Sequence, residues 1–259
     1  MKIGLSYNLF DGEELLESSI FCIRNCVDYI SVVYQKNSNY NSNCNPDLIN
    51  ILNNLRFSGL IDEIVEYKPD FQLLPWQNEL KKRNIGLNLS KLNNCSHHLT
   101  FDTDEFFDNS QFTNMLDVVV SGDYDSSVCK TKIFYKSSKF QLDVDIDTQV
   151  PLLYKISEQS EFIHNHEFPV LVDPTRRMKP GKCKIFKPEE IIMYHMSYVR
   201  RDLEKKLINS SARVNFEDSI ADVVEYYKNW KEGLPALMPG NPAHKIEIIK
   251  VDNKFGINF

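Results

Sequence analysis

The sequence lacks the features that mark several other classes of protein. Its six cysteines form no Cys-x-x-Cys pair and no dense framework, which argues against a zinc finger and against a disulfide-stabilised scaffold. Basic residues are not in excess, because 30 Lys and Arg face 36 Asp and Glu, and a nucleic-acid-binding domain would usually carry a basic face. We therefore expect free thiols and no nucleic-acid partner.

The sequence also has no long apolar segment. No uninterrupted run reaches the roughly 18–20 residues that cross a bilayer. Residues 1–5 lead straight into a strand pattern rather than into a signal peptide. We expect a cytoplasmic protein. Contact with the inner face of a membrane stays open, because a cluster of basic residues follows position 199.

What is present is a globular composition, with 42% hydrophobic residues in a chain of 259, enough for one large α/β domain. In the first half, strand patterns alternate with helical patterns. We expect strands at residues 2–7, 29–34, 61–67 and 98–101, and helices at 11–25, 46–58 and 77–93. This order predicts a Rossmann-like, mostly parallel central sheet flanked by helices, whose ligands gather beyond the carboxyl ends of the strands.

The second half is less regular. We expect strands at 128–134, 149–155, 183–186, 191–195 and 246–251, helices at 201–213 and 216–231, and a loop at 161–182. No Gly/Ser linker or internal repeat separates the halves. A single domain over 1–259 is therefore expected, in which the regular alternation of strand and helix patterns ends near Ser121.

Two carboxylates lie where the fourth expected strand ends. Asp102 and Asp104 are two residues apart, with an apolar strand before them and Phe106 and Phe107 after them. Hard oxygen ligands of this kind suit Mg²⁺ or Mn²⁺, which bridge phosphate oxygens. A solvated acidic turn is the alternative, although such a turn does not need apolar residues on both sides.

This stretch carries a resemblance to a known family. The segments KRNIGL at 82–87 and HLTFDTDEF at 98–106 resemble the central signature of GT-A glycosyltransferases, and more narrowly of the bacterial family-2-like and family-92-like enzymes. The opening IGLSYN at 3–8 and VVYQ at 32–35 are similar to their first two strands. The chain departs from family 2 after the second strand, where QKNS at 35–38 replaces Asp-Asp-Gly-Ser.

The resemblance implies roles for individual residues. Asp104 would ligate the Mn²⁺ or Mg²⁺ that bridges the donor diphosphate, and Asp102 would contact the metal or the ribose. The residues implied in nucleotide binding are Tyr7 and Gln35, at the base and ribose, and Lys82 and Arg83, which approach the nucleotide or hold the acidic motif. Residues 1–120 then form a nucleotide-sugar-binding half, and residues 121–259 an acceptor-binding half.

Two further candidates come from the segment MYHMSYVRR at 193–201. GT-A enzymes often use a late histidine as a metal ligand, so the resemblance makes His195 the third ligand beside Asp102 and Asp104. A hydrogen-bonded core histidine is the alternative. Arg200 is expected to neutralise the departing diphosphate. The alternatives for this basic cluster are a membrane surface and a solvated helix face that pairs with Asp202 and Glu204.

An inverting transferase also needs a carboxylate that takes the proton of the acceptor hydroxyl. Asp173, in the loop at 161–182, is the candidate base, ahead of Glu167. Asp173 could instead only start a turn before Pro174. The same loop holds a His-x-His pair at 164–166, but no further ligand spacing supports a zinc site there.

These features together predict a metal-dependent glycosyltransferase. It would move a sugar from a nucleoside-diphosphate donor to a hydroxyl of a glycan or lipid-linked acceptor, and the resemblance suggests a setting in surface-polysaccharide synthesis. A nucleotidyltransferase is one alternative, but it would carry a Gly-rich cationic loop after the first strand, where NLFDG stands at 8–12. A non-catalytic carbohydrate- or partner-binding domain is the other.

Overall fold

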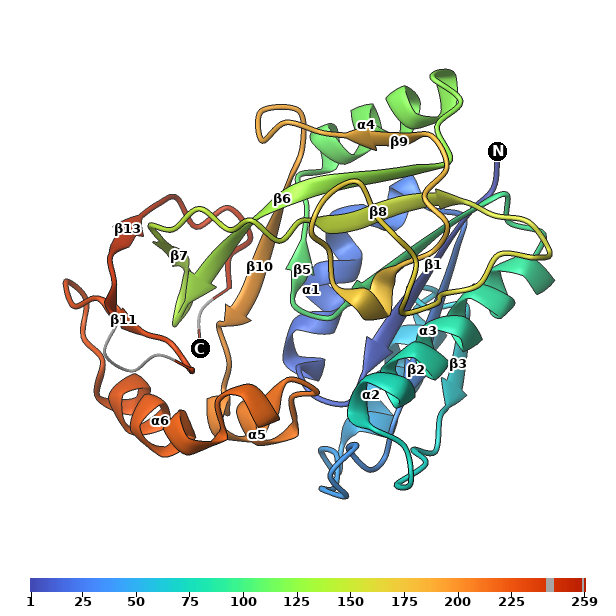
Figure 1. Ribbon diagram of the computed structural model, residues 1–259. Helices are drawn as coiled ribbons and strands as arrows, with labels where there is room; N and C mark the ends of the chain where they lie inside the picture. The colour runs from blue at the N-terminus through green and yellow to red at the C-terminus, as the bar shows by residue number, and fades with distance from the viewer. Residues whose placement is uncertain (241–244, 258) are drawn as a thin grey trace.

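The computed structural model describes residues 1–240, 245–257 and 259 (Figure 1). In the first half the strands are β1 (Ile3–Leu9), β2 (Tyr29–Tyr34), β3 (Glu63–Glu66), β4 (His97–Asp102) and β5 (Glu105–Phe106). The helices are α1 (Glu13–Ile23), α2 (Leu48–Phe57), α3 (Pro75–Leu92) and α4 (Asn109–Ser121). The alternation of strand and helix expected up to position 101 is therefore present, while α4 and β5 lay in a stretch with no expected element.

The second half adds shorter elements. The strands are β6 (Ser126–Tyr135), β7 (Ser137–Leu142), β8 (Val150–Lys155), β9 (Cys183–Ile185), β10 (Ile192–Tyr198), β11 (Ala236–Leu237), β12 (Lys245–Ile246) and β13 (Ile248–Lys250). The helices are α5 (Leu203–Asn209) and α6 (Ile220–Asn229), and a short 3-10 turn, η2, covers Pro174–Arg176. Both α5 and α6 are shorter than their hydrophobic patterns indicated.

Eleven strands form one sheet in the order β13-β7-β6-β8-β4-β1-β2-β3, in which β9 and β10 also pair with β6, and β5 pairs with β10. Strands β11 and β12 form a separate two-stranded sheet. The part made of β4, β1, β2 and β3 is parallel, and β8 joins it antiparallel to β4. The register of β1 on β4 sets Asn8 opposite Asp102. The carboxyl ends of these two central strands therefore lie side by side.

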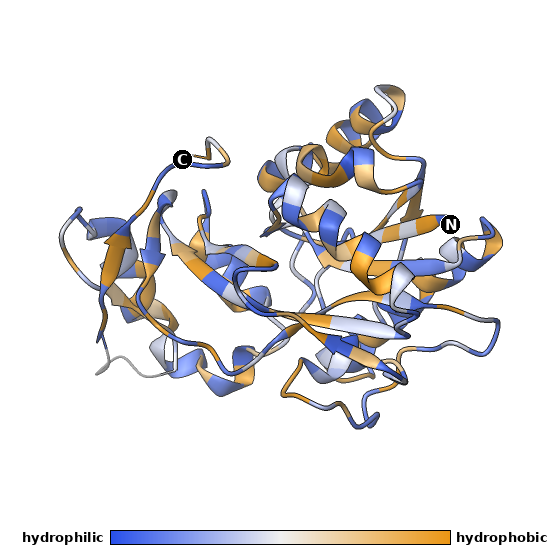
Figure 2. Ribbon diagram, turned by 90° about the horizontal axis from the view of Figure 1, so that it is seen from above, coloured by the Kyte–Doolittle hydropathy of each residue, from blue (hydrophilic) through white to orange (hydrophobic). Residues whose placement is uncertain are grey.

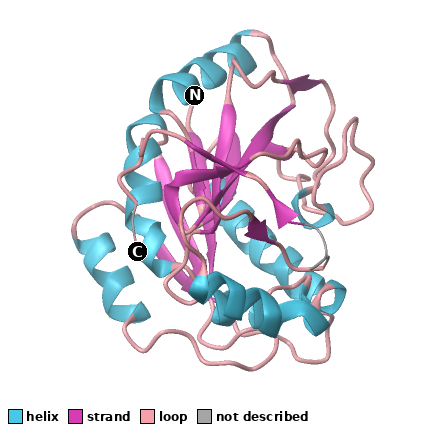
Figure 3. Cartoon of the chain, turned by 90° about the vertical axis from the view of Figure 1, so that its left-hand side faces the viewer, coloured by secondary structure: helices cyan, strands magenta, loops and turns pink. Residues whose placement is uncertain are grey.

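Helices cover both faces of the parallel part, as Figure 3 shows with the strands enclosed between helices. Helix α3 packs closely on β1 because Gly86 has no side chain. A Cβ atom at that position would lie 2.0 Å from the Ser6 hydroxyl on β1. This close approach brings Lys82 and Arg83, one turn earlier on α3, toward the carboxyl ends of β1 and β4.

Two main apolar clusters hold the fold together. The larger one lies between the parallel strands and α1, α2 and α4, and its strand residues are fully or almost fully buried. Figure 2 shows this as hydrophobic colour along the central strands. A separate cluster joins α5 and α6 to β7 and β11, around Leu203, Val223 and Tyr227. The second cluster is what anchors the segment after β10 to the rest of the chain.

Two expectations from the sequence concern free thiols and membrane-spanning segments. All six cysteines are free in the described structure, as expected. Among the described residues, no helix combines the length and the hydrophobicity that a membrane span needs.

Candidate functional site

A cavity of about 310 Å³ opens at the carboxyl ends of β1 and β4. Its walls come from both halves of the chain. The first half supplies the loop after β1, helix α3 and the acidic motif, and the second half supplies η2, β10 and the residues around α5. The polar residues named below line it or lie directly behind the lining. Because α/β sheets bind ligands at this edge, the cavity is the candidate active site.

Asp102 lies at the tip of β4 between two arginines. Arg83 from α3 donates to both of its carboxylate oxygens, at 3.3 and 3.4 Å, and Arg176 from η2 donates at 2.5 Å. Arg83 is itself fixed by a 3.0 Å hydrogen bond to Thr100. Burial alone would raise the pKa of Asp102, but the two guanidiniums outweigh it and hold the pKa below its usual value.

Asp104 is more deeply buried and faces three cationic or titratable groups. Its Oδ2 atom accepts from Arg200 at 2.5 Å and from Lys206 on α5 at 3.0 Å, and it lies 3.4 Å from His195 on β10. Burial opposes ionisation, yet Lys206 and Arg200 hold the pKa of Asp104 well below its usual value. Burial lowers the pKa of Lys206 to about 8, against the opposite effect of Asp104.

The chain positions these groups through β10 and α6. Strand β5 pairs with β10 so that Glu105 lies opposite His195, and the backbone N–H of Met196 donates to the carbonyl of Asp104. The Tyr227 hydroxyl on α6 donates to the carbonyls of Tyr198 and Arg200, at 3.0 and 3.1 Å. The second apolar cluster therefore fixes the backbone that carries Arg200.

Gly12 makes room for the Arg200 side chain. Its backbone has a φ of 87°, which favours glycine, and it is the residue before α1. An added Cβ would lie 2.0 Å from Nη1 of Arg200 and 2.6 Å from the Thr103 hydroxyl. Only a residue without a side chain fits between the start of α1 and the guanidinium.

Two charged residues of the site were not predicted from the sequence. Arg176 bridges Asp102 and Glu105, and both Arg176 and Glu105 are almost completely buried. Burial raises the pKa of Glu105, and Arg176 counteracts this. Lys206 belongs to the basic cluster after position 199, for which a diphosphate, a membrane surface and a solvated helix face were the expected alternatives, and it lines the cavity. Nothing in the local sequence marks Arg176, because its partners lie more than 70 positions away.

The predicted metal ligands do not form a metal-binding cluster. His195 reaches Asp104, but Asp102 faces Arg83 and Arg176 instead. Within residues 1–240, 245–257 and 259, no group of three His, Cys, Asp or Glu side chains is placed to hold a metal ion. A divalent cation would have to displace several buried cations, which repel it. The arrangement thus does not fit the expected Mn²⁺ or Mg²⁺ site, and nucleotide binding with and without Mn²⁺ is the test of the expected metal requirement.

Four other predicted residues take different positions. Lys82 and Asp173 line the cavity, and Asp173 also caps η2, since its Oδ1 accepts from the N–H and the hydroxyl of Thr175. Tyr7 and Gln35 do not line it. Tyr7 is fully buried on the α1 face, with its hydroxyl 2.9 Å from Ser19, because alternation along β1 turns its neighbour Asn8 toward Asp102 instead.

Gln35 lies beyond the neighbouring strand β2, outside the cavity lining, and its Nε2 donates to Asn39 at 3.0 Å. Within the basic cluster after β10, Arg200 and Lys206 point inward to Asp104, while Arg201 is exposed. His164 of the possible zinc pair stacks on Trp76, with ring centroids 4.3 Å apart.

Comparison with known proteins supports the fold. No family model and no curated protein matches this sequence. Among solved structures, Staphylococcus aureus TarS 1–349 matches with a TM-score of 0.51 and 11% identity, over 87% of this chain and 72% of that one. The same fragment in complex with UDP-GlcNAc matches with a TM-score of 0.51 and 10% identity, over 78% and 59%.

The first four matching structures are all of TarS, and this chain spans 36% to 72% of their lengths. TarS is a glycosyltransferase. The expected fold class, a mostly parallel central sheet flanked by helices in a mixed α/β architecture, is therefore confirmed and matches a glycosyltransferase structure. The structural similarity supports a GT-A-like fold. The narrower resemblance to family 2 or family 92 stays a prediction.

Proposed function

We propose that this protein is a glycosyltransferase that moves a sugar from a nucleoside-diphosphate donor to a hydroxyl of a glycan or lipid-linked acceptor. The observation that carries the proposal is the cavity at the carboxyl ends of β1 and β4, whose lining includes the cationic residues Lys82, Arg83, Arg200 and Lys206. The TarS complex with UDP-GlcNAc makes UDP-sugars the first donors to test. Synthesis of surface polysaccharide is the setting suggested by the family resemblance.

The diphosphate would be held by side chains rather than by a metal. Arg200 gives one N–H to Asp104, while its Nε and Nη1 atoms have no partner among the described residues. Lys82 is 3% exposed and has one long contact, 3.4 Å to Glu79. Such donors match phosphate oxygens, and they stabilise the charge that builds on the leaving group.

The reaction needs one bond to form and one to break. The acceptor hydroxyl oxygen attacks the anomeric carbon, and the bond from that carbon to the diphosphate oxygen breaks with its electron pair on the diphosphate. The hydroxyl proton passes to a base. Asp173 is the candidate for that base if the reaction inverts configuration, because its carboxylate lines the cavity.

The nucleotidyltransferase alternative gains no support from the cavity. The end of β1 contributes Asn8 to the lining and the loop after it contributes Phe10 and Asp11, and this segment has no cation that could hold a triphosphate. A non-catalytic binding domain remains a separate outcome, in which nucleotide binds without turnover.

The test is a thermal-shift panel of nucleoside diphosphates on the wild type, Lys82→Met and Lys81→Met. Lys81 is the matched control, since it is the next residue on α3 and is exposed. A nucleotide present at about 100 times its dissociation constant should raise the melting temperature of the wild type and of Lys81→Met by roughly 5–10 °C. Lys82→Met should respond much less. If no nucleotide shifts the wild type, the proposal fails.

A further inference from the structure

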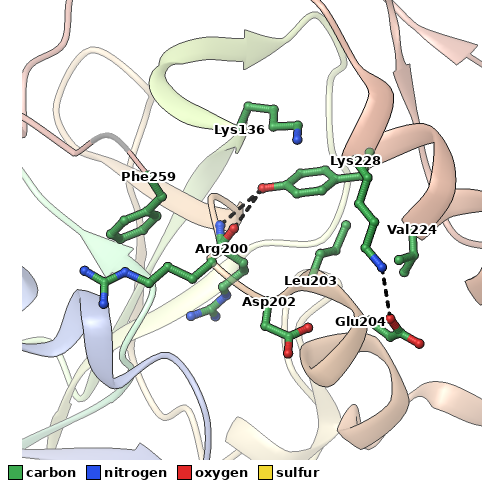
Figure 4. A pocket seen from close by; sticks show the side chains of 10 residues that line it. Lys136, Arg200, Asp202, Leu203, Glu204, Val224, Lys228 and Phe259 are labelled. Atoms are coloured by element: carbon green, nitrogen blue, oxygen red, sulfur yellow. Dashed lines mark hydrogen bonds and ion pairs between the residues drawn. The ribbon is translucent and has the colours of Figure 1, made fainter.

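A second cavity, of about 500 Å³, lies beyond Arg200 (Figure 4). Its walls are the turn between β6 and β7, the segment from Arg200 to the start of α5, helix α6, and Phe259. Arg200 lines this cavity and also the candidate active site. A ligand here would therefore lie next to a donor bound at the carboxyl ends of β1 and β4.

The charges around this second cavity are not balanced. Four cationic side chains and two carboxylates line it, and neither carboxylate pairs with Lys136 or Arg201. Asp202 accepts from the backbone N–H of Lys205, and Glu204 pairs with Lys228 at 3.3 Å, the contact dashed in Figure 4. Among the described residues, the ion pairs of the cavity's cations are those of Arg200 with Asp104 and of Lys228 with Glu204, and neither Lys136 nor Arg201 pairs with an Asp or Glu side chain. The residues outside that description include no Asp or Glu.

Aromatic rings hold the two unpaired cations at the cavity. The Lys136 ammonium lies 3.7 Å from the centre of the Tyr227 ring, and the Arg201 guanidinium lies 5.2 Å from the centre of the Phe259 ring. These contacts position the cations without neutralising them. Burial lowers the pKa of Lys136, and a bound anion would relieve that cost.

The backbone at Lys136 supports a functional interpretation. Its φ is 64°, a left-handed conformation that glycine or asparagine adopts more readily than lysine. Its N–H is held by the carbonyl of Tyr198 at 2.8 Å. A lysine kept in a conformation unfavourable for its residue type, with its charge unpaired at a cavity, is what a ligand-binding position would show.

We propose that this second cavity binds an anionic group, a phosphate or a carboxylate, on the sugar acceptor. Lys136 and Arg201 would contact the anion, and the apolar wall formed by Leu203, Val224 and the Tyr227 ring would contact the face of the sugar. The assignment to the acceptor rests on the proposed function. Arg200 lines both cavities, so a ligand in the second cavity would lie beside a sugar donor only if a donor binds in the first. Binding of an anionic sugar does not depend on that assignment.

The test is calorimetric titration, without nucleotide, of three sugars that differ in charge: glucose, glucose 6-phosphate and glucuronate. We expect at least one anionic sugar to bind at least about tenfold more tightly than glucose, and the stronger of the two identifies phosphate or carboxylate. Equal binding of all three, or no binding of any, would overturn the proposal.

Variants locate the site. Lys136→Met and Arg201→Met should each weaken the anionic sugar by about tenfold or more, because each removes a charge-assisted hydrogen bond. Arg201 is exposed, so this variant keeps the test decisive if Lys136→Met fails to fold. Lys139→Met, on the same hairpin but outside the cavity, is the matched control and should bind as the wild type does. Equal loss in Lys139→Met would place the anion elsewhere.

A parallel titration of UDP into the wild type separates the two proposals. If UDP binds and neither anionic sugar does, the second-cavity inference fails and the proposed function stands. If an anionic sugar binds through Lys136 and UDP does not bind, the anion site stands. The glycosyltransferase proposal then fails, and the assignment of the sugar as an acceptor fails with it.

Discussion

Replacement of Arg176 by methionine should destabilise the protein strongly. The Arg176 side chain is 5% exposed and donates to Asp102 and to Glu105, whose side chain is 1% exposed. Methionine keeps much of the volume but leaves Glu105 as a buried carboxylate with no cation. Breaking a buried ion pair in this way costs roughly 3–5 kcal/mol of the free energy of unfolding. For a chain of this size that corresponds to a fall in melting temperature of roughly 6–20 °C.

The measurement is urea unfolding of the wild type and Arg176→Met, with Arg213→Met as the matched control. Arg213 pairs with Glu217 at 3.5 Å, where the two side chains are 33% and 56% exposed, so its loss should cost less than about 1 kcal/mol. The double variant Arg176→Met/Glu105→Gln should recover part of the loss, because it leaves no uncompensated buried charge at position 105. An Arg176→Met variant as stable as Arg213→Met would refute the reasoning.

The pH dependence of the free energy of unfolding tests the same buried carboxylate, Glu105. Burial raises the folded-state pKa of Glu105 above its unfolded value, and removal of Arg176 raises it further. Ionising Glu105 in the folded protein therefore lowers the free energy of unfolding in full above the raised folded-state pKa. Below the unfolded-state pKa the carboxyl is protonated in both states, and this cost is absent. The stability difference between wild type and Arg176→Met should be larger at pH 8 than at pH 5.

The remaining predictions concern the cations and the glycine of the site. Lys206 has a pKa of about 8, so UDP affinity should fall as pH rises from 7 to 9.5, and Lys206→Met should lose most of that dependence in calorimetric titrations. Gly12→Ala should cost about 1–2 kcal/mol from its left-handed backbone and should also weaken UDP binding by displacing Arg200. Gly59→Ala is the matched control, because Gly59 has a φ of 77° and a Cβ atom added there would meet no other atom within 4 Å. This variant should lose stability but keep its affinity for UDP. Equal UDP affinity in the two glycine variants would contradict the role of Gly12.

The sequence predicted the parallel part of the sheet well because its signals are local. The strand expected at 29–34 coincides with β2, and the one at 98–101 lies inside β4. Buried parallel strands are continuous apolar runs, which a single sequence displays directly. Helix α4 was not predicted, although Asp108 caps it, because its apolar residues follow the acidic motif with no loop pattern between them.

The site was predicted less completely because its contacts are long-range. Asp102 and Asp104 stand out by their position at a strand end. Their partners Arg176, Arg200 and Lys206 come from segments 74 to 102 positions later, and no local spacing links them. A sequence shows the acidic motif, but not that its carboxylates are already matched by buried cations.

Side-chain direction explains why Tyr7 lies outside the cavity lining. Tyr7 and Asn8 are adjacent on β1, and the strand turns them to opposite faces. Tyr7 packs at 6.0 Å from Phe101 in the core, while Asn8 lines the cavity. An error of one residue in placing a strand end therefore exchanges a core residue for a binding residue.

The most direct test of the account is a calorimetric titration of UDP into the wild type in buffer that contains EDTA, repeated with Mn²⁺ in its place. The site geometry predicts one UDP bound per chain in EDTA, because Arg200 and Lys82 supply the positive charge, and little gain in affinity from Mn²⁺. Binding that occurs only with Mn²⁺ would contradict the account of the cations. The absence of UDP binding in both buffers would contradict the nucleotide-sugar site itself.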